Sequence, residues 1–251
     1  GVYSAPVRLV EVANLLPVLL MTSVYPLLAA AAGRDAARVD RLFRTSLRLL
    51  CAVIVPVTLL EMAFAGPLVA RLFGTDYLDS AHVLPVLAAT LPLMYADVVL
   101  NSRFLATGLE RRNVQLVLAA AVTNIAANLV LIPGRGAVGA AEATWIAYAV
   151  RILVTFVPAD TRPAAISAFR SMAPSALAGG AAAAVTWWLA FRPAADGAGG
   201  AAGAAGAATN VGLAIGLVAG AAVYLAVLVL ARGVRRRESG EILRALRRQD
   251  R

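Results

Sequence analysis

The sequence predicts an all-α, polytopic membrane protein with about seven transmembrane helices. Hydrophobic residues make up 61% of the 251-residue chain and charged residues only 15%. Ordinary soluble domains carry about 25% charged residues, so this composition excludes that class. The apolar residues also form runs of about 20, which is the length needed to cross a hydrocarbon core. Because lipid offers no partner for backbone N–H and C=O groups, each run must be helical.

Charged, glycine and proline residues separate seven apolar runs. They cover residues 6–31, 46–66, 83–105, 114–132, 138–157, 172–191 and 211–231. We expect the first six to form a transmembrane bundle over residues 1–191. The bundle is followed by an Ala/Gly-rich extracytoplasmic loop at 192–210, the last span at 211–231 and a basic cytoplasmic tail at 232–251.

Arginine placement orients these spans in the membrane. Seventeen arginines fall in one set of alternate loops and in the tail, whereas Arg71, Arg135 and Arg192 lie on the opposite side. By the positive-inside rule, the C-terminus is cytoplasmic and Gly1 is extracytoplasmic. The net charge of +9 therefore belongs to topology and does not indicate a nucleic-acid partner.

Catalytic and metal-binding patterns are missing from the sequence. No nucleophile, base and orienting group are spaced together, and no phosphate-binding Gly–Lys loop occurs. The single Cys51 cannot build a Cys-based metal site, and its apolar surroundings indicate a small buried side chain. The sequence therefore predicts that the protein is not an enzyme and has no metal centre.

Ionisable residues at membrane depth are the candidate functional residues, because each costs about 2.5–3.5 kcal/mol at a helix centre. Arg8 and Glu11 are three residues apart and share one helix face. Arg8 is either an interfacial arginine neutralised by Glu11, or a guanidinium group that binds an anionic part of a substrate in a low-dielectric cavity.

Asp97 and Asn101 are four residues apart and also share a face. Asp97 is either an interhelical hydrogen-bonding residue or a proton or sodium site coupled to transport. Glu142 and Arg151 are nine residues apart, on opposite sides of their helix, so each needs a partner elsewhere. Glu61 stands near the external end of its span and is expected at the interface.

Residues 123–144 form the most informative stretch of the chain. Asn124 and Asn128 share a helix face and predict polar contacts between helices. Pro133 and the glycines up to Gly136 predict a hinge before the next span. Gly139, at the start of that span, permits a close approach of helices.

Motifs over residues 1–157 resemble the polysaccharide and lipid II flippases of the multidrug/oligosaccharidyl-lipid/polysaccharide exporter superfamily. The motifs are the opening Gly-Val-Tyr-Ser-Ala-Pro-Val-Arg-Leu-Val-Glu, Leu72-Phe73-Gly74 followed by Tyr77, and the stretch from Asn124 to Thr144. Their order and spacing carry the resemblance, whereas the last two spans agree only in hydropathy and topology.

The resemblance implies about fourteen helices in two similar lobes, which open a central cavity alternately to the two sides of the membrane. This chain would be the C-terminal lobe, with the missing N-terminal lobe of the same protein as its partner. The substrate would be an undecaprenyl-pyrophosphate-linked oligosaccharide, moved across the bacterial cytoplasmic membrane for cell-surface polysaccharide biosynthesis. An H+ or Na+ gradient or the membrane potential would drive transport, without another cofactor.

The resemblance also implies roles for particular residues and partners. Arg8 falls on the position whose basic residue faces the cavity and holds the pyrophosphate, whereas Glu142 replaces a residue that is usually apolar. Membrane lipids surround the bundle, and the polysaccharide polymerase machinery is a further candidate partner. Two alternatives stay open: a cation-coupled multidrug antiporter of the same superfamily and a transport-inactive membrane scaffold. An antiporter for cationic drugs would favour an acidic, aromatic cavity, but aromatic residues make up only 6% of this chain.

Overall fold

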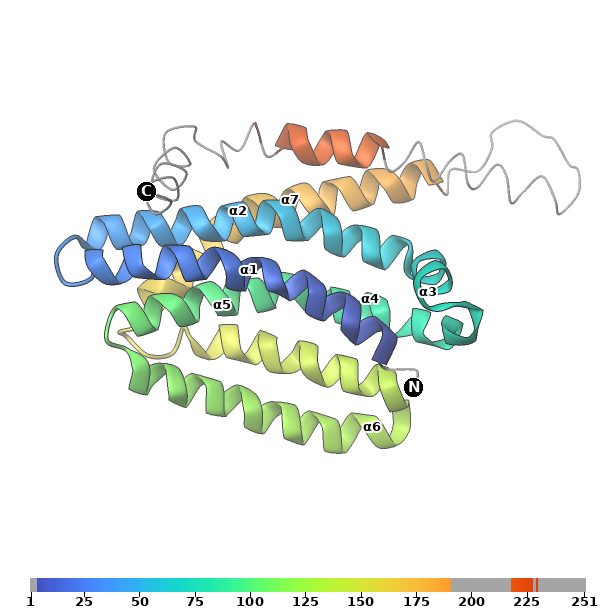
Figure 1. Cartoon of the computed structure of the whole chain (residues 1–251), viewed down its shortest axis with the longest axis horizontal. Helices are drawn as coiled ribbons and strands as arrows, with labels where there is room; N and C mark the ends of the chain where they lie inside the picture. The colour runs from blue at the N-terminus through green and yellow to red at the C-terminus, as the bar shows by residue number, and fades with distance from the viewer. Residues whose placement is uncertain (1–3, 191–217, 228, 230–251) are drawn as a thin grey trace, which may run out of the picture. The chain divides into compact units, whose positions relative to one another are not determined.

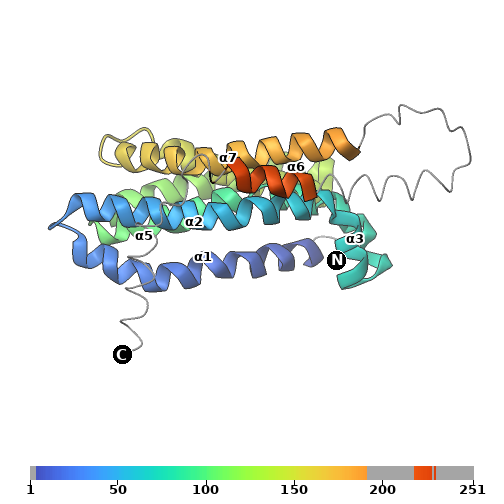
Figure 2. The ribbon, with the colours of Figure 1, turned by 90° about the horizontal axis from the view of Figure 1, so that it is seen from above.

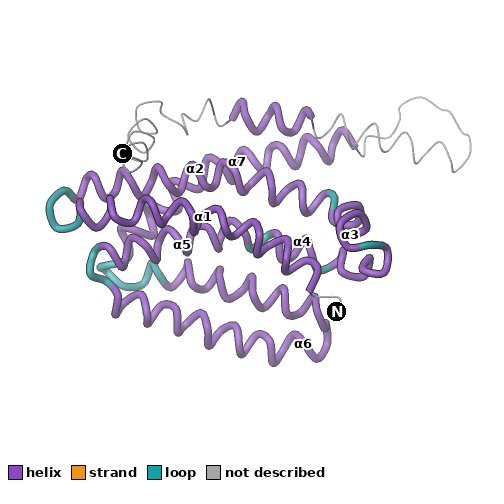
Figure 3. The backbone as a smooth tube through the Cα atoms, in the orientation of Figure 1, coloured by secondary structure: helices purple, strands orange, loops and turns teal. Residues whose placement is uncertain are grey.

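The computed structural model describes residues 4–190, 218–227 and 229. All regular structure in these ranges is helical (Figure 3), which confirms the predicted all-α class. The helices are α1 (Ser4–Ala31), α2 (Ala36–Ala63), α3 (Ala65–Phe73), the 3₁₀ helix η1 (Thr75–His82), α4 (Leu84–Ala88), α5 (Leu91–Ala106), α6 (Glu110–Val154), α7 (Arg162–Ala190) and a short segment at Val218–Val227.

The chain divides into two compact units. The described part of the first unit runs to Met172 and contains α1 to α6 and the first turns of α7. The second unit begins at Ala173 and holds the remainder of α7 and the Val218–Val227 helix. The predicted loop at 192–210 and tail at 232–251 lie outside the described residues, as does much of the last predicted span.

Helices α1, α2 and α5 build the core of the first unit and run side by side in Figures 1 and 2. Their core-facing side chains recur at helical spacing and have no exposed surface; examples are Val24, Leu28, Phe43, Leu47, Val99 and Leu100. Apolar side chains also cover the outside, as Leu15 (58% exposed) and Leu129 (72% exposed) illustrate. Because lipid is as apolar as leucine, van der Waals packing holds such a core together.

Helix α6 is a hairpin of two limbs, residues 110–135 and 137–154, and Figure 1 shows the chain turning back between them. The break is at Gly136, whose φ of 53° and ψ of −128° are not helical. A Cβ atom on Gly139 would overlap the carbonyl group of Leu131, so the start of the second limb requires glycine. The predicted hinge is therefore present, but it bends at Gly136 and Pro133 remains helical.

Helices and predicted apolar spans do not begin and end at the same residues. Helix α2 begins ten residues before the predicted start at residue 46, and Asp35 caps it by accepting a hydrogen bond from the Arg38 backbone N–H at 2.8 Å. The predicted span 83–105 is broken into α4 and α5, each with a proline in its first turn. Helices α3 and η1 were not predicted, since they are too short to form spans.

Among the residues that the structure describes, four segments are long and apolar enough to cross a membrane, namely Val7–Ala31, Ala36–Ala63, Leu84–Ala106 and Glu110–Val154. The last is the α6 hairpin and therefore provides two limbs. The α1–α2, α5–α6 and α6–α7 connections meet at one end of the first unit (Figures 1 and 3). This end carries the arginine-rich loops, as alternating spans require, whereas the Gly136 bend lies at the other end.

Candidate functional site

A buried charged network joins α5 to both limbs of α6. Arg151, on the second limb, is only 2% exposed, and its Nε lies 3.1 Å from Oδ1 of Asp97 on α5. Its Nη2 donates a hydrogen bond of 2.6 Å to Oδ1 of Asn113 on the first limb, and its Nη1 donates one of 3.1 Å to Oγ1 of Thr155. An arginine in a low-dielectric interior needs such partners, because an unpaired charge there is costly.

Asn113 completes the network and was not predicted. Its Nδ2 donates a hydrogen bond of 2.6 Å to Oδ1 of Asn101, one turn beyond Asp97 on α5. Three helical segments thus meet through polar side chains rather than through apolar packing alone. Asn113 was overlooked because it stands immediately before the predicted span 114–132, beside two arginines that resemble a loop. Its burial, with 5% exposed, became evident only from the fold.

Arg8 and Glu11 lie apart from this network. Both side chains are exposed on the face of α1 opposite its buried stripe of Val24 and Leu28. Within the described ranges, neither residue has an ion-pair or hydrogen-bond partner. The expected neutralisation of Arg8 by Glu11 is therefore not observed, and the guanidinium group is available to a ligand or another chain segment.

Glu142 pairs locally at the bend of α6. Nη1 of Arg135 donates to both carboxylate oxygens of Glu142 at 2.7 Å. Arg135 is 60% exposed and Glu142 is 27% exposed, so this ion pair is at the edge of the fold. Glu142 and Arg151 thus take separate partners, as their spacing predicts. Nine residues, or about 13 Å along the helix, separate them.

The two asparagines of α6 bond to each other rather than across helices. Nδ2 of Asn128 donates a hydrogen bond of 3.0 Å to Oδ1 of Asn124, one turn earlier in the same limb. The expected helix-to-helix contact is not among the hydrogen bonds of the described residues. A spacing of four allows both outcomes, because it places the side chains beside each other as well as on one face.

Two further acidic residues take part in the packing of the first unit. Asp40 accepts hydrogen bonds from Nη1 of Arg103 and from Oγ of Ser167, both at 3.0 Å, and pairs with Arg44 at 3.0 Å. It links α2, α5 and the start of α7. Glu61, expected at the membrane interface near the external end of its span, is 9% exposed, and its Oε2 has no hydrogen-bond partner within the described structure.

These features define the class of protein: a helical membrane bundle whose buried charged side chains pair with one another. A family model described as "Lipid II flippase MurJ" matches residues 3–194. The chain belongs to this MurJ family, whose members are transporters and not enzymes.

A solved structure titled "Lipid II flippase MurJ, inward closed conformation" has the same fold. It matches 90% of this chain with a TM-score of 0.60 and 15% sequence identity. This chain covers 47% of that structure, or about half of its length. No curated protein matches the sequence of this chain.

Proposed function

We propose that this chain is the C-terminal lobe of a flippase for a polyprenyl-pyrophosphate-linked saccharide, with an undecaprenyl-pyrophosphate-linked oligosaccharide as the substrate. The family match over residues 3–194 is the observation that carries the proposal. The complete transporter needs a second lobe, and the chain's coverage of about half of a solved flippase is consistent with that requirement. The two lobes present a site alternately to the two sides of the membrane.

Arg8 is the proposed contact for the pyrophosphate. It is exposed on the outward face of α1 and has no partner within the described chain, so its five N–H donors are available. A diphosphate loses hydration when it enters a site shielded from bulk water, and a guanidinium fork offsets that loss with two parallel charge-assisted hydrogen bonds. Glu11 follows one turn later on the same face and limits the net positive charge there.

Asp97 is the proposed coupling residue for H+ or Na+. Its Oδ1 is buried, but 24% of the side chain is exposed, so an ion can reach the carboxylate without leaving Arg151 exposed. Neutralisation of Asp97 would weaken its attraction to Arg151, and this change would loosen the second limb of α6 from α5. Asn101 would then retain the first limb through Asn113. This arrangement links ion binding to helix packing inside the lobe.

The proposed setting is the bacterial cytoplasmic membrane, with the arginine-rich end of the first unit on the cytoplasmic side. The missing lobe of the same protein and the polysaccharide polymerase machinery are the proposed partners. In this orientation the Gly136 bend and the Arg135–Glu142 pair face the extracytoplasmic side.

The test uses the complete protein as the sole flippase of a cell, and measures the lipid-linked precursor in the outer leaflet. We expect Arg8→Ala to reduce the amount of precursor that reaches the outer leaflet by about 10- to 100-fold, because one charge-assisted contact is lost. The abundance of the protein in the membrane should stay normal. Arg34→Ala is the matched control, because Arg34 is an exposed arginine just beyond the other end of α1. Unchanged export by Arg8→Ala would remove Arg8 from the mechanism, and drug extrusion without precursor flipping would refute the proposed substrate.

The coupling proposal has its own readout in the same assay. Asp97→Asn is expected to make the remaining flipping insensitive to the H+ and Na+ gradients, because the amide cannot exchange a proton or hold a cation as a carboxylate does. Flipping that still follows either gradient would exclude Asp97 as the coupling residue, without affecting the assignment of Arg8.

A further inference from the structure

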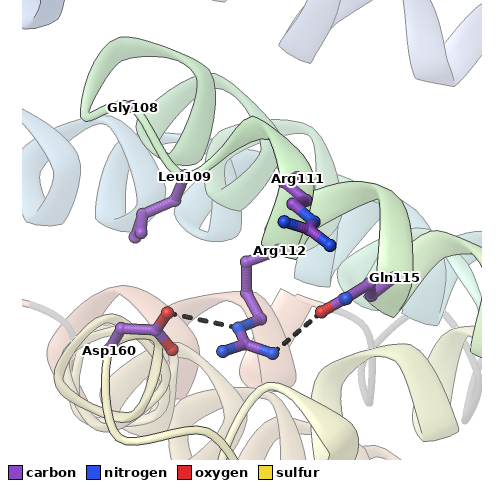
Figure 4. Close-up of a pocket in the computed structure, with 6 residues that line it drawn as sticks. All are labelled: Gly108, Leu109, Arg111, Arg112, Gln115 and Asp160. Atoms are coloured by element: carbon purple, nitrogen blue, oxygen red, sulfur yellow. Dashed lines mark hydrogen bonds and ion pairs between the residues drawn. The ribbon is translucent and has the colours of Figure 1, made fainter.

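A pocket of about 280 Å³ opens at the arginine-rich end of the first unit. It lies where the α5–α6 turn meets the connection between α6 and α7, and Figure 4 shows the side chains around it. The lining residues are Gly108, Leu109, Arg111, Arg112, Gln115 and Asp160. Two arginines and one aspartate leave the lining with one excess positive charge.

Arg112 is fixed in this pocket by two neighbours. Its Nε lies 3.2 Å from Oδ2 of Asp160, and its Nη1 donates a hydrogen bond of 2.8 Å to Oε1 of Gln115 (Figure 4). These contacts hold the guanidinium plane in place, so little side-chain entropy is lost when a ligand accepts its remaining N–H groups.

Arg111 has no ion-pair or hydrogen-bond partner within the part of the chain that the structure describes. The beginning of α6 adds backbone N–H donors at the same place, because its N-cap residue Leu109 makes no side-chain capping bond; the first turn also carries one acidic residue, Glu110, which does not line the pocket. The first backbone N–H groups of a helix lack intrahelical acceptors and favour an anion. The pocket therefore matches the chemistry of a phosphate group.

A stripe of exposed apolar side chains leads away from Arg111 along the first limb of α6. It consists of Val114, Leu118, Val122, Ile125 and Leu129, which are between 56% and 72% exposed. Their spacings of three and four residues place them on the same helix face as Arg111. A free phosphate ion would make no use of this surface, whereas acyl chains would extend along it.

We propose that this pocket binds the phosphate headgroup of an anionic glycerophospholipid from the leaflet at the arginine-rich end, with the acyl chains on the α6 stripe. Basic pockets at the cytoplasmic ends of membrane helices are suited to anionic headgroups. Arg111 is the freely available contact, and Arg112 is a contact held in position by Asp160. Lipid binding at this pocket is independent of the transport cycle, since it requires only that the chain is embedded in a membrane.

The experiment measures lipid binding to the complete purified protein by native mass spectrometry. Phosphatidylglycerol and phosphatidylcholine with identical acyl chains are compared, together with water-soluble glycerophosphoglycerol and undecaprenyl pyrophosphate. We expect Arg111→Gln to weaken phosphatidylglycerol binding about fivefold, the contribution of one arginine near a membrane surface, and Arg111→Gln with Arg112→Gln to weaken it further. Binding of phosphatidylcholine should not change.

Arg34→Gln is the matched control, because Arg34 is exposed at the same end of the bundle but does not line the pocket. Arg111→Gln removes no internal contact, so its melting temperature should equal that of the unsubstituted protein. Equal binding of phosphatidylglycerol by Arg111→Gln and by Arg34→Gln would overturn the proposal. It would also be overturned if glycerophosphoglycerol bound as tightly as the lipid, or if only undecaprenyl pyrophosphate depended on Arg111, since the site would then belong to free phosphates or to the substrate.

Discussion

Replacing Asp97 by Asn is expected to destabilise the protein strongly, although its side chain is 24% exposed. The substitution keeps the size of the side chain but leaves Arg151, which is 2% exposed, with only neutral partners. At the observed separation of 3.1 Å and an effective dielectric constant of about 20, the lost attraction is about 5 kcal/mol. A new hydrogen bond from the amide group and the partial exposure of Asp97 reduce this loss, so we expect about 3 kcal/mol.

The opposite substitution, Arg151→Met, should cost less. It removes the charge that is fully buried and leaves Asp97, whose side chain is 24% exposed and can still be hydrated. The expected loss is about 1–3 kcal/mol, which includes the hydrogen bond that Asn113 can no longer accept. The loss of stability in the double variant should be about 2 kcal/mol smaller than the sum of the two single losses. This difference is the interaction energy of the pair.

The assay is equilibrium unfolding of the complete protein in detergent, with the free energy of unfolding obtained from a denaturant titration. Glu61→Gln is the matched control, because Glu61 is a buried acidic residue on α2 with no ion-pair partner in the described structure. Because Glu61→Gln breaks no ion pair, it should leave the free energy of unfolding within about 0.5 kcal/mol or raise it. Equal losses for Asp97→Asn and Glu61→Gln, or additive losses in the double variant, would refute the assigned ion pair.

Two further predictions concern the hairpin and the Asp40 cluster. Gly139→Ala should destabilise the fold by about 2–3 kcal/mol through overlap with the Leu131 carbonyl. Gly136→Ala should cost about 1–2 kcal/mol, because the site has open space but a positive φ. A thermal unfolding experiment in which Gly136→Ala is the more destabilising substitution would contradict the bend. Asp40→Ala should cost about 1–2 kcal/mol by removing its contacts with Arg103 and its neighbours. High salt should shrink this difference in melting temperature, and a salt-independent loss would exclude an electrostatic origin.

Hydropathy and residue spacing predicted the class and much of the plan of the first unit. The apolar runs identified α1, the α6 hairpin and the alternation of arginine-rich ends. The spacing of Glu142 and Arg151 also implied separate partners. The spacing rules did not predict the partners themselves, since Asp97 and Arg151 are 54 residues apart in sequence. Asn113 and Asp40 were overlooked because their arginine neighbours resemble loops, whereas both residues belong to helices that extend past the apolar core.

The sequence by itself determined that the chain is a helical membrane protein, because an apolar composition and the absence of water leave the backbone only its own hydrogen bonds. It also determined where the hairpin could form, since Gly136 and Gly139 permit a turn that other residues resist. Only the tertiary structure decided which buried charges neutralise each other. Which charges pair depends on distances of a few ångströms between helices, because the Coulomb energy falls with distance. The position of either residue in the sequence does not give that distance.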